Sequence, residues 1–196
     1  MLSQEDKFNN NKAPIKHWNH SDYNKQSNGY YVIRTKNNDA DNNMSKRLER
    51  LDKKLNKILI NLDVLVNYPE VARLLRMDSF LNGGLELLKT YHTGTKSLAE
   101  LEWRNSPNFF GVNYPYGVSE TGSFPLGTDR FLRARSRKIY LGIRNSTPFE
   151  TDKLIVHELS HTICNDVVYR AVHSDNFKKA EILMKTLWYS KNIKSL

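Results

Sequence analysis

The stretch from Leu154 to Cys164 contains a single residue that is fully charged at neutral pH, Glu158. The remaining side chains are aliphatic, hydroxyl-bearing, thiol or imidazole groups. A helix of this composition has no broad polar face for solvent, so it is stable only when protein covers most of its surface. A carboxylate buried within such a helix is costly unless a metal or a specific polar network compensates its charge. The sequence therefore predicts a largely buried helix that carries a compensated acid.

The beginning of this helix can also be predicted. Thr147, Pro148 and Glu150 form the pattern of a capping box with proline at the first helical position. We expect the helix to run from there to about Cys164.

Residues 157–161 read HELSH, which is the HExxH motif, and they lie inside the predicted helix. Histidines four positions apart lie one turn apart on the same face, so His157 and His161 can both reach one zinc ion at about 2.0–2.1 Å. Glu158 points about 100° away from its neighbour, because a helix has 3.6 residues per turn. It is then free to take a proton from a water whose pKa zinc lowers toward about 7. The motif predicts a hydrolytic site with one zinc ion per chain and Glu158 as the catalytic base.

A catalytic zinc site requires a third protein ligand and an open coordination position. The continuation typical of metzincins would need glycine at position 164 and histidine at 167, where this chain has Cys164 and Val167. Glu181 stands 20 residues beyond the second motif histidine, and His173 stands 12 residues beyond it. We favour His173, because it follows a predicted loop and precedes the final helix, and Glu181 remains the alternative. Cys164 is expected to be a core thiol.

Composition limits the class of protein. Lys and Arg number 30 against 21 Asp and Glu, and the resulting net charge of +9 favours a polyanionic partner such as nucleic acid. The single cysteine excludes an internal disulfide. No run of about 18 apolar residues is present and the first residues lack an apolar signal segment. The sequence predicts an intracellular, cytoplasmic or nuclear protein that does not enter a membrane.

The chain is expected to form one domain, residues 29–196, after a disordered tail, residues 1–28, which is rich in Asn, Lys, Asp and Ser. A short strand is predicted at 30–33. An amphipathic helix is predicted over 44–66, with Ser45 as its N-cap. Its apolar positions recur at steps of three and four: Leu48, Leu51, Leu55, Ile58, Leu62 and Leu65.

Two further helices are predicted, at 70–75 and 84–89, separated by the breaker Asn82-Gly83-Gly84. Short aromatic and β-branched runs between 98 and 145 predict a sheet, whose clearest strand is 138–144, and 111–127 is expected to be a loop or hairpin. A last helix should begin near Ser174. The order of elements predicts an α+β fold with a small, mostly antiparallel sheet and flanking helices.

Several motifs together resemble those of the WLM metallopeptidases, relatives of the SprT-like proteases that cleave proteins crosslinked to DNA. The similar motifs are the strand KIYLGIR, the linker NSTPFETDKLIV, the motif HELSH and the segment HSDNF, within a catalytic core of residues 138–187. The resemblance implies a zincin-like fold, with His157, His161 and His173 as zinc ligands and Glu158 as catalytic base. YYVI and the leucine-striped helix that follows it also resemble WLM-like proteins of large DNA viruses, in which case the protein would act in the host cell.

In zincins a protein substrate commonly lies along an edge strand, and the strand at 138–144 is the candidate here. A basic run beside it is a candidate DNA-binding segment. It consists of Arg130, Arg133, Arg135, Arg137 and Lys138. We therefore expect a metalloendopeptidase that acts on DNA-bound or DNA-crosslinked proteins. The alternatives are a peptidase with no nucleic-acid role and a non-catalytic nucleic-acid-binding protein with a structural zinc.

Overall fold

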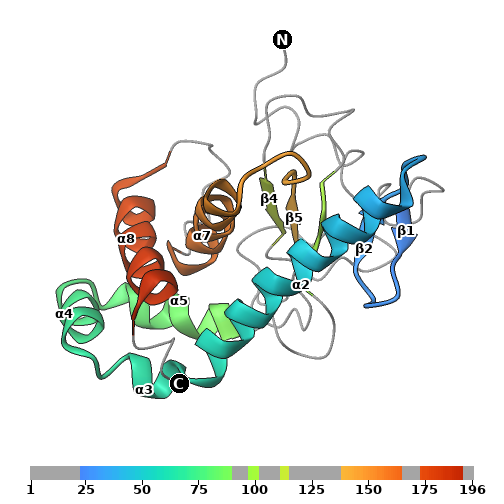
Figure 1. The fold of residues 1–196 in the computed structure, drawn as a ribbon. Coiled ribbons are helices and arrows are strands. Elements are labelled where there is room, and N and C mark those ends of the chain that lie inside the picture. Colours follow the sequence, from blue (N-terminus) through green and yellow to red (C-terminus); the bar gives the residue numbers. More distant parts are fainter. Residues whose placement is uncertain (1–22, 90–96, 102–110, 115–137, 165–172, 192–196) are drawn as a thin grey trace, which may run out of the picture.

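A long helix, α2 (Asn38–Ile60), carries the leucine stripe into the core of the protein (Figure 1). The computed structural model describes residues 23–89, 97–101, 111–114, 138–164 and 173–191. These residues form a mixed α and β structure that is mostly helical, as the coarse fold prediction requires. The stripe residues are all buried, which confirms the predicted inner face, and the last two belong to a separate short helix, α3 (Leu62–Leu65).

The predicted start of this helix is wrong. The side chain of Asn37 accepts hydrogen bonds from the backbone N–H groups of Asp39 and Ala40, so the helix begins at Asn38, in an Asn/Asp-rich segment before the predicted start. Ser45 is buried within the helix, where its hydroxyl donates to the carbonyl oxygen of Asn42. The helix also ends at Ile60 rather than at position 66.

The next two helices are α4 (Pro69–Met77) and α5 (Phe80–Lys89). The predicted breaker, Asn82-Gly83-Gly84, lies inside α5. Gly84 serves close packing instead, because a Cβ there would lie 2.0 Å from the carbonyl oxygen of Ile163 on a neighbouring helix. The glycine therefore lets two helix backbones approach each other.

Two short strands, β1 (Tyr23–Lys25) and β2 (Tyr31–Ile33), form an antiparallel hairpin, with Tyr23 opposite Ile33. Gly29 has a φ of 86° and closes the turn, a conformation that glycine adopts without strain. The predicted strand is thus confirmed. The predicted tail is wrong from Tyr23 onward, because pairing with β2 supplies the backbone hydrogen bonds that the composition argument ignored; residues 1–22 lie outside the described residues.

A three-stranded sheet has the order β3 (Leu98–Glu100), β5 (Lys138–Leu141), β4 (Gly111–Tyr114). β3 runs parallel to β5 and β4 runs antiparallel to it. The sheet is therefore mixed rather than mostly antiparallel. The strand predicted at 138–144 is central, so the expectation that it is an edge strand for substrate is wrong.

A charged network joins the hairpin, α2 and the sheet. The guanidinium of Arg144 donates to both carboxylate oxygens of Glu100, at 2.7 Å each, and to Asp41 at 2.8 Å. It also donates to the carbonyl oxygen of Ile33 at 2.9 Å. Both carboxylates are buried, so Arg144 compensates charges that would otherwise be costly.

Two C-terminal helices complete the fold: α7 (Pro148–Cys164) and α8 (Asp175–Tyr189). They lie side by side, with α7 between α8 and the sheet (Figure 1). α8 begins next to the predicted Ser174 and buries one face against the core, namely Phe177, Ala180, Leu183 and Leu187. No helix in the described ranges is long and apolar enough to cross a membrane.

Candidate metal centre

Helix α7 begins with the predicted capping box. The backbone N–H of Thr147 donates to the Glu150 carboxylate at 2.7 Å, and the N–H of Glu150 donates back to the Thr147 hydroxyl at 3.3 Å. Ile155, Leu159 and Ile163 are fully buried. The prediction of a largely buried helix is confirmed, and this packing holds the HExxH turn against the core; the predicted end of the helix stays a prediction, because residues 165–172 lie outside the described residues.

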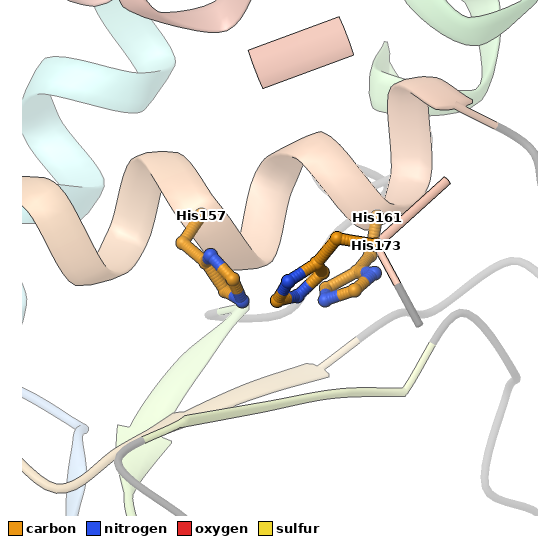
Figure 2. A group of neighbouring side chains, drawn as sticks. All are labelled: His157, His161 and His173. Atoms are coloured by element: carbon orange, nitrogen blue, oxygen red, sulfur yellow. The ribbon is translucent and has the colours of Figure 1, made fainter. Parts of the chain in front are cut away.

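Three histidines meet below α7 (Figure 2). His157 and His161 project from successive turns of the helix, and His173 approaches from the start of α8. One ring nitrogen from each lies within 4.8 Å of the others. Ligand nitrogens that share a tetrahedral zinc at about 2.0–2.1 Å stand roughly 3.3 Å apart, so modest ring rotations would bring all three to one ion.

His173 owes its position to the N-terminus of α8. The hydroxyl of Ser174 accepts a hydrogen bond from the backbone N–H of Phe177 at 3.1 Å, which caps the helix and fixes the residue before it. Phe177 is buried and lies against all three imidazoles. Its ring centroid is 4.3 Å from that of His173, 4.5 Å from His161 and 5.0 Å from His157. This phenylalanine restrains the three rings, a contact that the sequence did not predict.

The two other ligand candidates lie differently. The carboxylate of Glu181 is 4.0 Å from Nδ1 of His157 and forms an ion pair with Lys185 at 3.0 Å. At 4.0 Å the carboxylate lies beyond hydrogen-bonding distance of the ring, so a small movement would be needed for it to orient a metal-binding His157. Cys164 is buried, and its thiol donates to the carbonyl oxygen of His161 at 3.4 Å. Neither residue belongs to the three-histidine group.

The protonation states favour metal binding. Burial, followed by the nearby imidazoles of His157 and His173, lowers the pKa of His161 to about 3. Burial also lowers the pKa of His157, with a further contribution from His173. Both rings are therefore neutral at neutral pH, which is the form that binds a metal. His161 and His173 still expose part of their surface, so the described residues leave one side of the centre open.

The side chain of Glu158, a residue of α7, lies against β4 and is almost fully buried. Burial raises the pKa of this carboxyl to about 8. A nearby divalent cation would reverse that shift by favouring the charged form. The expectation that this acid is buried is confirmed, and the compensation of its charge stays a prediction.

Two residues of β4 contact this part of α7. Sequence analysis did not identify them, because residues 111–127 were expected to be a loop or hairpin. A Cβ at Gly111 would lie 2.5 Å from a carboxyl oxygen of Glu158. The side-chain amide of Asn113 donates to the carbonyl oxygen of Glu158 and, at 2.9 Å, to the hydroxyl of Thr162. Residues 115–127 lie outside the described residues.

The basic run Arg130, Arg133, Arg135 and Arg137 lies outside the described residues, as does the side chain of Lys138. Tyr140 lies on β5, the central strand of the sheet next to α7. It is buried with Ala99 and Leu101 on the sheet face opposite Ile139, which packs in the core with α7, so it does not reach the histidines.

Comparison of the chain with family models, with curated proteins and with solved structures finds no match.

Proposed function

We propose that this protein is a zinc-dependent metalloendopeptidase of the WLM type. The observation that carries the proposal is the meeting of ring nitrogens of His157, His161 and His173 within 4.8 Å of one another, two of them on the helix that also carries Glu158. Three imidazoles with an open side are the donor set of a catalytic zinc site rather than of a closed structural one. The similarity of the HELSH and HSDNF segments to WLM metallopeptidases supports the same activity.

In this proposal the three histidines hold the zinc, which when bound acts as a Lewis acid on a substrate carbonyl and lowers the pKa of a bound water toward about 7. Glu158 accepts the proton of the attacking water and delivers it to the leaving amine. Its burial keeps competing solvent away from the carboxyl, and a neighbouring zinc ion would keep the carboxyl in the charged form that accepts a proton.

The substrate backbone would pair with β4 rather than with β5. Among the described strands β4 is an edge strand, and Asn113 ties it to the helix that carries the histidines. A peptide added to this edge would lie beside the metal centre, held by main-chain hydrogen bonds that do not depend on its sequence.

The proposed substrates are proteins bound or crosslinked to DNA. The net charge of +9 and the basic run beginning at Arg130 support this class, because phosphate groups attract clustered Lys and Arg. A peptidase without a nucleic-acid role is the alternative. Proteolysis of a DNA-binding protein with and without DNA, over a salt series, separates them. The proposed class requires stimulation by DNA that declines as salt rises, whereas DNA-independent cleavage supports the alternative.

The activity itself is tested with the zinc-loaded full chain and an unfolded protein substrate. Cleavage should occur, and Glu158→Gln should reduce it by at least about 100-fold while zinc content stays at one ion per chain. An exposed acid on α4, changed in Glu70→Gln, is the matched control and should cleave at the wild-type rate. A zinc-loaded wild-type protein that cleaves nothing would support a non-catalytic zinc protein instead.

A further inference from the structure

We infer that strand β4 positions the carboxyl of Glu158: Gly111 leaves the space in which the carboxyl lies, and Asn113 fixes the helix turn that carries it. This inference rests on the proposed function, because it gives β4 a role in placing the catalytic base. Both residues are positioning residues, since they act through Glu158 rather than on substrate.

The first observation is the fit between Gly111 and the end of the Glu158 side chain. A Cβ at position 111 would lie 2.5 Å from Oε1 and 2.8 Å from both Cδ and Cγ. Optimal contacts between carbon atoms are about 3.5–4.0 Å, so a methyl group and the present carboxyl cannot occupy these positions together. All three atoms belong to the flexible side chain and none to the helix backbone. A side chain at 111 would therefore move the carboxyl and leave α7 in place.

The second observation is the pair of hydrogen bonds made by Asn113. This residue is two positions from Gly111, so both project from the same face of β4. Its amide donates to the carbonyl oxygen of Glu158 and to the hydroxyl of Thr162, which lies one helical turn further along α7. Two bonds to one turn fix where the strand lies along the helix. A shift of one residue would turn the Gly111 position to the other face and abolish the fit.

Confinement by β4 matters because little else holds the carboxyl. Among the described residues no side chain hydrogen-bonds to it, and burial is the one cause of its altered acidity. A glutamate side chain on a helix otherwise samples several rotamers. A displacement of about 1 Å at a reacting group can cost roughly 100-fold in rate, so the space beside Gly111 is a requirement for catalysis and not only for packing.

The kinetic test compares Gly111→Ala with Gly83→Ala in the zinc-loaded full chain. Gly83 lies in α5, where an added Cβ meets nothing within 4 Å, so it is the matched control. Gly111→Ala should lower kcat about 100-fold, with KM and zinc content unchanged, because position 111 faces Glu158 and not the outer edge of the strand. Asn113→Asp, which loses the donor, should also lower kcat at constant zinc content. If Gly111→Ala has the kcat of the wild type, the inference is wrong. If Asn113→Asp has the kcat of the wild type, Asn113 does not help to position Glu158.

A second measurement does not depend on peptidase activity. Gly111→Ala is made in the wild type and in Glu158→Ala, and the Tm of each of the four proteins is measured. Shortening residue 158 removes the three atoms that would lie nearest to the new Cβ. We expect Gly111→Ala to lower Tm in the wild type and to have little effect in the Glu158→Ala background, the coupling expected of two residues in contact. If the two substitutions change Tm additively, the inference is wrong. Coupling in a protein that cleaves nothing would uphold the contact and refute the proposed function.

Discussion

Replacing Glu158 by Gln should stabilise the metal-free protein as the pH rises. The pKa of this carboxyl is about 8 in the folded chain and 4.5 when it is solvated. Between these values the folded protein holds a proton that the unfolded chain has lost, so the free energy of unfolding falls with increasing pH. Each pH unit contributes about 1.4 kcal/mol, and the difference between 4.5 and about 8 amounts to about 5 kcal/mol. Glutamine carries no charge and avoids this loss.

The assay is urea unfolding of chelator-treated wild type and Glu158→Gln, followed by far-UV circular dichroism from about pH 5 to about pH 9. The variant should gain on the wild type from about pH 5 to about pH 8 and no further above it, by about 4 kcal/mol in all, a large part of the 5–15 kcal/mol typical of a domain. Histidine titration affects both proteins equally and cancels in the difference. Glu70→Gln, at an exposed position of α4, should follow the wild type at every pH. Added zinc should narrow the gap, because a neighbouring cation favours the carboxylate. A stability difference that does not change with pH would refute the argument from burial.

Three other substitutions test the surroundings of the site. Arg144→Leu leaves two buried carboxylates without their partner and should cost about 3–5 kcal/mol in urea unfolding; a cost below about 1 kcal/mol would contradict the role of the network. Glu181→Gln should weaken zinc affinity by about tenfold in competition with a chelator, because the carboxylate beside His157 no longer orients the ring; equal affinity would remove that role. Phe177→Ala should cost about 3–5 kcal/mol of stability and also weaken zinc binding, since this ring packs on all three imidazoles; zinc affinity that stays unchanged would show that the contact does not restrain them.

The parts of the site that sequence predicted well are those set by local patterns. HExxH within an apolar helix places two imidazoles on one face whatever the remainder of the fold, and Thr147 with Glu150 defines where that helix begins. His173 was favoured because it precedes a helix, and the structure brings it to the other two histidines.

The parts that sequence missed depend on contacts between distant segments. Gly84 resembles a helix breaker until Ile163 is placed against it, and Asn37 resembles part of a loop until its side chain caps α2. The order of strands in a sheet also cannot be read from the alternation of polar and apolar residues along one strand, so β5 could not be recognised as the central strand. The contact of Gly111 with Glu158 joins residues 47 positions apart, counted from 111 to 158, and no periodicity encodes it.

The most direct test of the account is the zinc content of the purified chain and of His173→Ala, measured by elemental analysis alongside far-UV circular dichroism. The account predicts one zinc per wild-type chain, and loss of tightly bound zinc in His173→Ala with an unchanged helical spectrum. A folded wild-type protein that takes up no zinc, or a variant that retains it with wild-type affinity, would contradict the three-histidine centre.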